Sequence, residues 1–550
     1  MDQSLRIILA QQDFFVGDVI GNTRKIIHSM GEAARQRANL IVFPELTLTS
    51  YPIDDLLWRP AIREQVERAL MEVCQHTQDV AVVIGFPEWG EDNIVYNSAA
   101  FIYNQKIELI YRKQQLPNYA VFDEQRYFSP GDSVGVFQLN GTKVGISICE
   151  DIWFSQPAAK AKKAGAQLLV NMNASPYHRE KSREREDAVM QRTQETGIPI
   201  VYVNLVGGQD ELVFDGASFV IDEKGHCVCR LNPFEEILGV VDFKVSPESV
   251  VVDPDSCEVA AYTPDVETVY KALVLGVKDY IKKNGFTGAV IGLSGGIDSA
   301  LTIAIAVDAL GHQNVEAVML PSRYTSNMSR EDARALANRL DVEYREISIE
   351  KAFEAFLETL EQEFDGLAAD VTEENIQARC RGVILMAISN KKGKIVLTTG
   401  NKSEMAMGYS TLYGDMAGGF NVLKDVPKTL VYQLSEFVNR DQEIIPRRII
   451  DRPPSAELRP DQKDEDSLPP YTVLDDILER YVEQYQSVNT IIAAGFDAEI
   501  VRQVIRLLDR NEYKRRQAPP GVKITPVAFG KDRRYPITSG YSESNNMGDD

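Results

Sequence analysis

The chain has 550 residues, of which 44% are hydrophobic and 25% charged, and its formal net charge at neutral pH is −22. A single domain typically holds about 100–200 residues, so this length and composition indicate a globular protein with several cores. Acidic side chains outnumber basic ones, 81 against 59, which argues against nucleic acid or an anionic membrane as the main partner. A nucleotide ligand stays compatible with this charge, because a few local lysines and arginines suffice to hold it.

Three further features predict a cytoplasmic protein without a membrane anchor. The N-terminal residues show no signal-peptide pattern, and no apolar run approaches the roughly 20 residues of a membrane span. The six cysteines are scattered, and Cys227 and Cys229 do not have the spacing of a C-x-x-C pair. We therefore expect free thiols rather than disulfides.

Residues 1–245 alternate short apolar runs with amphipathic stretches. The apolar runs predict strands at 40–43, 80–85, 143–148, 167–170 and 199–203. The helical spacing predicts helices at 27–37 and 183–196. Strands mixed with helices in this way indicate a layered α/β domain.

Residues 246–264 are polar and rich in turn-forming pairs, which predicts a linker or a strand-like extension between domains. Residues 290–455 then have the pattern of a doubly wound α/β unit, with further strands at 315–320 and 394–398. Ligands bind beyond the carboxyl ends of the strands in such a fold, so Ser294, Pro321 and Thr399 are expected around one crevice.

The C-terminal part of the chain is expected to be less regular. Residues 451–470 are proline-rich and charged, which predicts a loop. Helices are predicted at 473–486 and 498–510, and residues 541–550 form a polar, acidic tail.

Three chemically complementary residues follow predicted strands of the first half. Cys149 can be a nucleophile, Glu45 can take its proton and later activate water, and Lys113 can stabilise an oxyanion. Each residue alone also fits a plainer interpretation, a buried inert cysteine or a solvated charge. Their combination at strand ends favours a catalytic centre.

A glycine-rich loop between a predicted strand and a predicted helix forms a candidate phosphate site. It consists of Gly292, Leu293, Ser294, Gly295, Gly296, Ile297, Asp298 and Ser299. Backbone N–H groups of such a loop and the helix N-terminus attract an anion, and the glycines allow a close approach. The loop lacks the Gly-Lys-Ser/Thr ending of a Walker A sequence. A ligand-free glycine turn is the alternative interpretation.

Other polar residues of the second half can complete a nucleotide site. Thr399 can hydrogen-bond a nucleotide, and Glu404 can join Asp298 in holding Mg²⁺ against phosphates. Asn375 and Arg379 lie four residues apart, hence on one helix face, and arginine can hold a phosphate or carboxylate with two parallel bonds. Further cations are Lys428 and Lys514. Lys514 belongs to a basic cluster that could equally be a solvated helix end.

Two sets of motifs resemble known families. Phe-Pro-Glu at 43–45, Tyr-Arg-Lys-Gln-Gln-Leu-Pro at 111–117 and Ile-Cys-Glu-Asp-Ile-Trp at 148–153 resemble the nitrilase superfamily, in that family's order Glu–Lys–Cys. This resemblance implies an α-β-β-α sandwich that attacks amides or nitriles. Ser-Gly-Gly-Ile-Asp-Ser at 294–299 resembles the pyrophosphate loop of the N-type ATP pyrophosphatases, which adenylate a carboxyl or carbonyl oxygen.

Segments 116–124, 173–177 and 397–404 resemble the glutamine-dependent NAD synthetases, and the likeness extends over nearly the whole chain. It implies a glutamine amidase domain at 1–245, a linker at 246–264 and a synthetase domain at 265–540. Ser455 stands where threonine is expected in related single-domain enzymes, which keeps the hydroxyl.

The same resemblance assigns the site residues. Glutamine would be bound by Tyr119, Glu124, Ser175 and Lys181; ATP by the 292–299 loop, Thr399 and Lys428; deamido-NAD by Asn375, Arg379, Glu404 and Lys514; and Mg²⁺ by Asp298 and Glu404.

The implied reaction is the amidation of deamido-NAD by ammonia from glutamine, through an adenylate, with ATP as co-substrate and Mg²⁺ as metal. The implied assembly is a homo-oligomer. Two alternatives stay open at this point. One is an amidating enzyme of the same mechanism that acts on another carboxylate, and the other is a protein that senses ATP or glutamine without turnover.

Overall fold

The computed structural model describes residues 3–247, 249–455, 457–459, 468–541 and 543. The chain divides into two compact units, Met1–Thr263 and Pro264–Asp550. Among the described residues, no helix is both long and apolar enough to cross a bilayer.

The first unit is built around two sheets. Within the described residues, the larger sheet has the order β15 (Val250–Val252), β14 (Ile237–Val245), β1 (Gln3–Gln11), β2 (Leu40–Val42), β3 (Ala81–Trp89), β4 (Val95–Tyr103), β5 (Lys106–Arg112). The smaller one has the order β13 (Cys227–Arg230), β12 (Phe219–Ile221), β9 (Ile200–Asn204), β8 (Leu168–Asn173), β7 (Thr142–Ile148), β6 (Gly135–Leu139). A hairpin of β10 (Val206–Gln209) and β11 (Leu212–Asp215) adjoins them.

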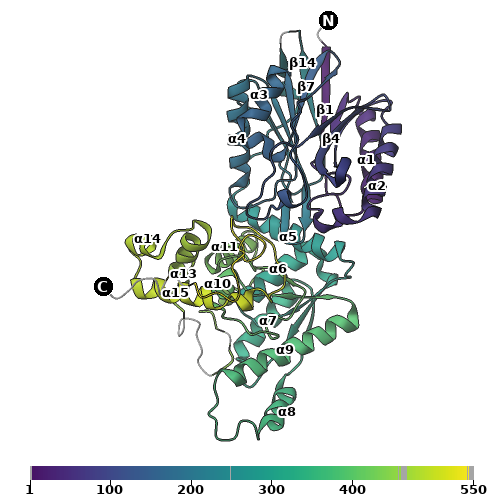
Figure 1. Cartoon of the computed structure of the whole chain (residues 1–550). Helices are drawn as coiled ribbons and strands as arrows, with labels where there is room; N and C mark the ends of the chain where they lie inside the picture. Colours follow the sequence, from purple (N-terminus) through teal and green to yellow (C-terminus); the bar gives the residue numbers. More distant parts are fainter. Residues whose placement is uncertain (1–2, 248, 456, 460–467, 542, 544–550) are drawn as a thin grey trace. The chain divides into compact units, whose positions relative to one another are not determined.

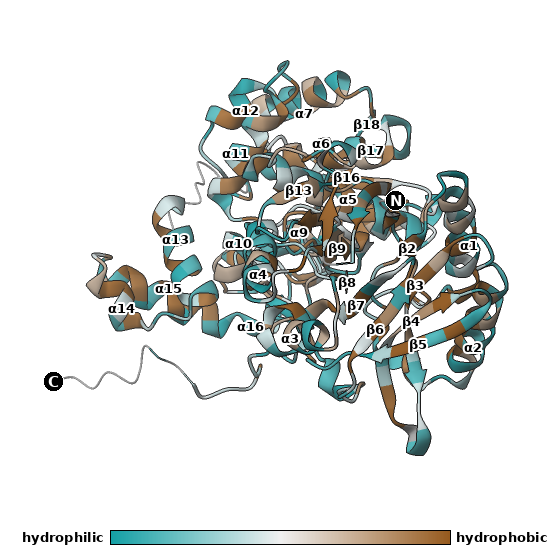
Figure 2. Cartoon of the chain, turned by 90° about the horizontal axis from the view of Figure 1, so that it is seen from above, coloured by the Kyte–Doolittle hydropathy of each residue, from teal (hydrophilic) through white to brown (hydrophobic). Residues whose placement is uncertain are grey.

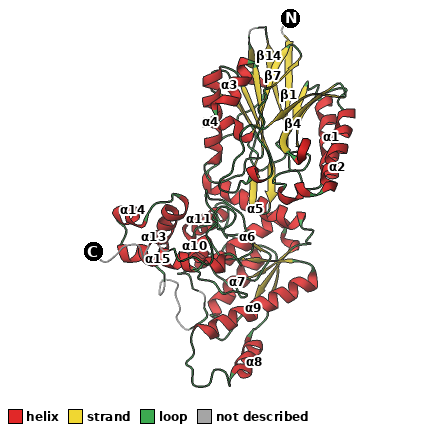
Figure 3. Ribbon diagram, viewed as in Figure 1, coloured by secondary structure: helices red, strands yellow, loops and turns green. Residues whose placement is uncertain are grey.

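Helices cover the outer faces of both sheets, which gives the α-β-β-α sandwich (Figures 1 and 3). Helices α1 (Val19–Arg35) and α2 (Pro60–Gln75) pack on the larger sheet, and α3 (Ser155–Lys163) and α4 (Lys181–Thr196) pack on the smaller one. Leu5, Val42 and Val170 are among the side chains that meet between the two sheets. Figure 2 shows the resulting contrast between the mostly hydrophilic α4 and the apolar strand β9.

Most predicted elements of this unit are present, and one difference has an identifiable cause. Helix α1 begins at Val19 rather than at 27, because the Asp18 side chain accepts a hydrogen bond from the Gly21 amide and caps the earlier start. Residues 246–264, predicted as a linker or a strand-like extension, contain β15, which extends the larger sheet by pairing with β14.

The expectation of free thiols is wrong at one pair. The structure joins Cys229 to Cys257, whose Cα atoms lie 5.3 Å apart. The pairing arises because the segment after η5 (Pro254–Ser256) runs along β13, where the Arg230 amide donates to Glu258 O and the Ala260 amide donates to Arg230 O. Cys74, Cys149, Cys227 and Cys380 are free.

The second unit contains a parallel sheet of order β18 (Glu343–Glu346), β17 (Val315–Met319), β16 (Ala289–Gly292), β19 (Ile395–Thr398), β20 (Phe420–Asn421). Helix α5 (Asp265–Lys283) leads into it, and α6 (Ile297–Leu310) and α7 (Asn327–Arg339) connect its first three strands. Helices α8 (Glu350–Leu360) and α9 (Val371–Lys392) share a core with Val290 and Val318. The strand order reverses between β16 and β19, and ligands of doubly wound folds bind at such a point.

A helical region follows the sheet. Its members are α10 (Lys402–Met407), α11 (Lys428–Val438), α12 (Arg447–Asp451), α13 (Tyr471–Leu478), α14 (Val488–Ala493), α15 (Ala498–Arg510) and α16 (Glu512–Arg515). The helix expected at 473–486 is α13 followed by a π-helical turn, η8 (Glu479–Glu483). Residues 456 and 460–467 of the predicted loop, and 542 and 544–550 of the predicted tail, lie outside the described residues.

Candidate active sites

The first candidate site gathers charged side chains inside the first unit. Lys113 directly follows β5, and its Nζ lies 2.6 Å from Glu45 Oε1 and 2.8 Å from Glu124 Oε1. All three side chains are buried. Asn97 Nδ2 and the Ala174 amide donate to the two Glu45 oxygens, at 2.7 and 3.0 Å, so this carboxylate is held from three directions.

Cys149 lies at the turn between β7 and the short helix η4 (Cys149–Trp153), with a positive φ of 41°. Such a backbone is costly for a residue with a Cβ and is common where a side chain must be presented in one direction. Burial raises the pKa of the Cys149 thiol well above its usual range, Glu45 raises it further, and Lys113 lowers it. The thiol therefore keeps its proton until a base removes it.

The two partners of the thiol also have shifted pKa values. Burial opposes the Lys113 charge, but Glu124 and Glu45 outweigh it and hold the pKa of Lys113 well above its ordinary value. Burial raises the pKa of Glu124 from 4.5 to about 7, against the effect of Lys113. Tyr51 Oη also donates to Glu124 Oε1, at 3.0 Å.

The remaining residues predicted to bind glutamine are Tyr119, Lys181 and Ser175. The first two contact residues that follow Cys149 in η4. Tyr119 Oη lies 3.1 Å from both carboxylate oxygens of Glu150. Lys181, at the start of α4, lies over the Trp153 ring at 4.4 Å. Burial raises the pKa of Glu150, and the charges of Lys113 and Lys181 only partly oppose this rise. Ser175 is buried and accepts a hydrogen bond from Arg185.

Sequence reasoning missed Asp151, which joins the Cys149 turn to the segment that follows Lys113. Its buried carboxylate accepts from the backbone amides of Ile148, Gln114 and Gln115 at 2.9–3.0 Å, and from Tyr111 Oη at 2.7 Å. These bonds fix the ends of β7 and β5 against each other. An acidic residue two positions after the cysteine was the available signal, but its partners lie 36 and 37 positions away.

The second candidate site is the glycine-rich loop between β16 and α6. Gly295 has a φ of 83°, and a Cβ there would lie 2.4 Å from the Ser329 carbonyl oxygen. Ser294 Oγ and Ser299 Oγ lie 3.1 Å apart, and the Gly296 amide donates to Ser294 Oγ. No side chain caps the N-terminus of α6 in the described residues, which suits an anion at this end.

A charged group lies beside this loop at the reversal point of the sheet. Lys428 Nζ contacts Asp298 and lies 3.3 Å from Glu404 Oε1, while Asn401 Nδ2 donates to the other Asp298 oxygen at 2.9 Å. Thr399, partly exposed, directly follows β19. The structure thus brings together Asp298, Glu404 and Lys428, which the sequence predicted as metal and ATP residues.

Three residues predicted for the acceptor meet at one loop, residues 408–412. Asn375 Oδ1 accepts from Thr411 Oγ1 at 2.8 Å, and Arg379 Nε donates to Leu412 O at 3.2 Å. Lys514 Nζ donates to the carbonyl oxygens of Gly408 and Ser410, at 2.7 and 2.9 Å. A pocket of about 610 Å³ adjoins this loop, with Val383, Met386, Leu412, Tyr413, Met416 and Gln517 among its lining residues.

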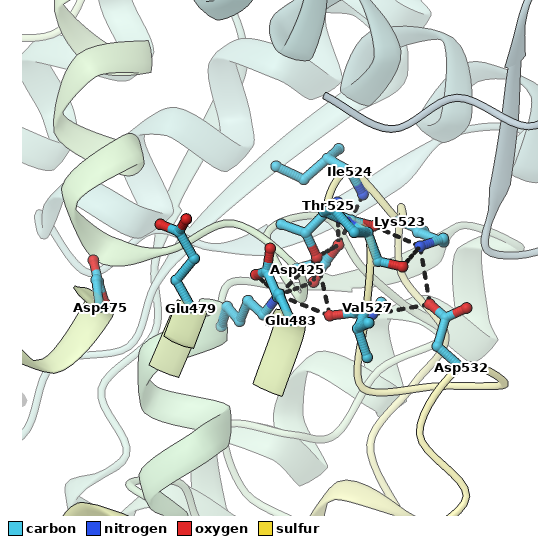
Figure 4. Close-up of polar contacts among 12 residues, drawn as sticks. Asp425, Asp475, Glu479, Glu483, Lys523, Ile524, Thr525, Val527 and Asp532 are labelled. Atoms are coloured by element: carbon cyan, nitrogen blue, oxygen red, sulfur yellow. Dashed lines mark hydrogen bonds and ion pairs between the residues drawn. The ribbon is translucent and has the colours of Figure 1, made fainter. Parts of the chain in front are cut away.

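A buried polar cluster joins the segments that carry Glu404 and Lys428 to the C-terminal segment (Figure 4). Lys402 Nζ lies 2.9 Å from Asp425 Oδ1, 2.7 Å from Glu483 Oε1 and 2.7 Å from Thr525 Oγ1. Asp425 in turn accepts from the amides of Ile524 and Thr525, both at 2.8 Å. No local sequence pattern indicates this cluster, because its members come from four separate segments.

The fold and the two sites define a class of protein in which a carbon–nitrogen hydrolase is joined to a nucleotide-dependent synthetase. Residues 6–248 match the carbon-nitrogen hydrolase family and residues 269–518 match the NAD synthase family. The chain is 46% identical to the glutamine-dependent NAD(+) synthetase of Acinetobacter baylyi over 98% of this chain and 99% of that protein. It is 49% identical to the one of Xanthomonas campestris, over 98% of both.

A solved structure supports the same assignment. The glutamine-dependent NAD+ synthetase from Acinetobacter baumannii in complex with ADP superposes with a TM-score of 0.79 at 43% identity, over 98% of this chain and all of that one. The chain belongs to the glutamine-dependent NAD synthetase family.

Proposed function

We propose that this protein makes NAD from deamido-NAD, ATP and glutamine, with glutamate, AMP and pyrophosphate as the other products. The observation that carries the proposal is the coexistence, in one chain of this family, of a buried Lys113 between two glutamates near Cys149 and of a phosphate loop beside Asp298, Glu404 and Lys428. No observation favours a different acceptor carboxylate.

In the first unit, Cys149 is the nucleophile and Glu45 the base. Glu45 takes the thiol proton as sulfur attacks the amide carbon of glutamine, since the raised pKa of Cys149 leaves little free thiolate. The ammonium of Lys113 stabilises the developing oxyanion. The proton returns to the leaving nitrogen, ammonia departs, and water activated by Glu45 releases glutamate from the thioester.

Glu124 balances the charge of this centre. One ammonium faces two carboxylates, so a pKa of about 7 lets Glu124 release or retain a proton near neutral pH. We assign glutamine binding to Tyr119, Ser175 and Lys181 on the grounds of the resemblance. Tyr119 and Lys181 also contact the Cys149 turn, through Glu150 and Trp153.

In the second unit, the nicotinate carboxylate of deamido-NAD attacks the α-phosphate of ATP and pyrophosphate leaves. The 292–299 loop, Thr399 and Lys428 hold ATP, and Asn375, Arg379, Glu404 and Lys514 hold deamido-NAD. Ammonia then displaces AMP from the adenylate. The loop N–H groups and Lys428 offset the negative charge of the leaving pyrophosphate.

The residues present fit a Mg²⁺ ion. Within the described residues, no group of three or more His, Cys, Asp or Glu side chains is placed to hold a metal. Asp298 and Glu404 supply two carboxylates that reach the same ammonium, and Mg²⁺ in nucleotide sites is held by one or two carboxylates plus phosphates. When bound, the ion would neutralise phosphate charge.

The metal assignment predicts a separation of the two activities. Glu404→Gln should raise the Mg²⁺ concentration needed for NAD formation by about tenfold or more, because a neutral amide is a weaker ligand than a carboxylate. Glutamine hydrolysis without ATP should change little. Metal titrations of both activities test this, and an unchanged Mg²⁺ requirement would contradict the assignment of Glu404.

The central experiment compares nitrogen sources. NAD formation is measured with glutamine or with ammonium in the wild type and in Cys149→Ala, with Cys227→Ala as the matched control thiol. The Cys149 variant should lose the glutamine-driven reaction by at least about a thousandfold and keep the ammonium-driven one. If the wild type makes no NAD from either source, the proposed acceptor is wrong.

On the resemblance alone we further propose a homo-oligomer that resides in the cytoplasm. Light scattering on the purified protein measures the first, and fractionation of the producing cells measures the second.

A further inference from the structure

Arg185 of α4 is one of the most deeply buried large side chains of the described residues, and the proposed reaction does not yet use it. Its guanidinium makes five hydrogen bonds, and a guanidinium has five N–H groups. Two run from Nη1 to the carboxylate of Asp215, at 2.7 and 2.9 Å. The other three go to residues 175–176, which we name the serine turn.

The contacts with the serine turn are specific. Nε donates to Ser175 Oγ at 3.0 Å, and Nη2 donates to the carbonyl oxygens of Ser175 and Pro176 at 2.8 and 2.9 Å. A hydroxyl that accepts from Nε still has its own proton to donate in another direction.

The serine turn lies next to the reacting groups. The amide of Ala174, one residue before it, donates to Glu45 Oε2 at 3.0 Å. Arg185 is also close enough to Cys149 for the two charges to interact. An arginine in this place could therefore act either through the hydroxyl of Ser175 or through the charge of the thiolate, and an experiment can separate the two routes.

We propose that Arg185 is a positioning residue of the glutaminase centre, which fixes Ser175 as a hydrogen-bond donor to an oxygen of glutamine. The ion pair with Asp215 holds the guanidinium plane, and the plane sets the direction of the hydroxyl. A substrate with an N–H group in place of this oxygen would direct a donor at the Ser175 hydroxyl, which is itself a donor. Such a substrate would be rejected. The inference rests on the proposed role of Ser175 in glutamine binding.

The test is a double-mutant cycle of Ser175→Ala and Arg185→Lys, with Arg6→Lys as control. Lysine keeps the charge against Asp215 but has no planar fork. Arg6 also pairs with an aspartate in the same unit: its Nε and Nη2 donate to the two carboxylate oxygens of Asp242, both at 2.7 Å. Three quantities are measured: the KM and kcat for glutamine hydrolysis, the alkylation rate of Cys149 by iodoacetamide, and ammonium-driven NAD formation.

Arg185→Lys and Ser175→Ala should each raise the KM for glutamine by about tenfold, the usual size of one lost hydrogen bond to a charged group. The double variant should be no worse than Ser175→Ala within about threefold, because both changes remove the same contact. Alkylation of Cys149 and the ammonium-driven reaction should stay within about twofold of the wild type, as should every activity of Arg6→Lys.

Four outcomes would overturn the inference. Losses that multiply in the double variant mean that Arg185 acts independently of Ser175. A slower alkylation with an unchanged KM means that it serves the thiolate. Loss of the ammonium-driven reaction in Arg185→Lys means a general structural role. An unchanged KM in Ser175→Ala removes Ser175 from the binding site, while a wild type inactive with ammonium would instead contradict the proposed function itself.

Discussion

Lys113 carries a charge in a place where water cannot reach it, and it is stable there only because two carboxylates share it. Removal of either carboxylate would leave the ammonium with one partner, and removal of the lysine would leave two buried acids facing each other. The protonation of each of the three groups therefore depends on the charges of the other two.

This arrangement predicts how the pH changes stability. The pKa of Glu124 is raised from 4.5 to about 7, so the folded protein holds an extra proton between these values and its stability falls as the pH rises through them. The glutamine of Glu124→Gln cannot titrate. The free energy of unfolding of this variant should therefore lack the decrease that Glu124 causes in the wild type, about 2 kcal/mol between about pH 5.5 and 7. Thermal unfolding of both proteins across this range measures the difference.

Glu88→Gln is the matched control for that experiment. Glu88 is half-buried and paired with Arg112, which together with Ser98 lowers its pKa despite burial. Its stabilising effect is present at neutral pH and lost as the pH falls below its ordinary value, the opposite sign. If the stability of the wild type and of Glu124→Gln changed with pH by the same amount, Glu124 would not titrate near pH 7.

At the scale of elements, the N-terminus of helix α11 is not capped by the residue that precedes it. A side chain of α13 caps it instead. Pro427 precedes the helix, and its side chain has no hydrogen-bond acceptor. Asp475 Oδ2 instead accepts from the amide and the hydroxyl of Thr429, at 2.9 and 2.8 Å, and its other oxygen contacts Ser403. One carboxylate thus fixes the elements that carry Lys428 and Glu404.

Asp475→Ala should cost about 1–2 kcal/mol of the stability of the second unit and raise the KM for ATP severalfold, since Lys428 begins the uncapped helix. The control is Asp497→Ala, because Asp497 caps α15 at an exposed site through the amides of Glu499 and Ile500. It should cost a similar free energy and leave the KM unchanged. Steady-state kinetics and thermal unfolding measure the two effects. If both variants changed the KM for ATP equally, Asp475 would have no specific role in positioning Lys428.

Elements with a simple pattern could be predicted from the sequence, and so could residues inside short motifs. Cys149, Glu45 and Lys113 follow strands at the expected places, and the strand–loop–helix at 289–310 is present. What could not be predicted is pairing between distant positions. Arg185 pairs with Asp215, 30 positions away, and Lys402 bonds to Thr525, 123 positions away. The residues next to a charged side chain do not indicate whether it will contact a buried partner or water.

At the scale of the whole molecule, the reaction needs neutral ammonia, although most ammonia is protonated at neutral pH. If the nitrogen passes from one centre to the other without mixing with solvent, ¹⁵N-amide glutamine in the presence of excess unlabelled ammonium should yield NAD that keeps most of the label. Mass spectrometry of the product measures the retained fraction. A label diluted to the isotope ratio of the bulk ammonium would show free exchange.

The net charge of −22 also has a meaning at this scale. ATP and deamido-NAD are anions, so the surface as a whole repels them at long range, an effect that salt screens. In the proposed sites, their attraction would come from short-range groups such as Lys428, Arg379, Lys514 and the loop amides. Moderate salt weakens complexes that depend on long-range attraction. It should therefore have little such effect on the binding of ATP and deamido-NAD.

The left-handed backbone of Cys149 has a cost that the proposed role of its thiol would explain. A φ of 41° suits glycine and is costly for a residue with a Cβ, whereas the nucleophile proposed for this position requires sulfur. Among inactive variants, Cys149→Gly keeps this backbone without strain, whereas Cys149→Ala loses the thiol and retains the strain. An evolutionary line released from the need to hydrolyse glutamine would accordingly be expected to drift towards glycine at this position and gain a sturdier domain.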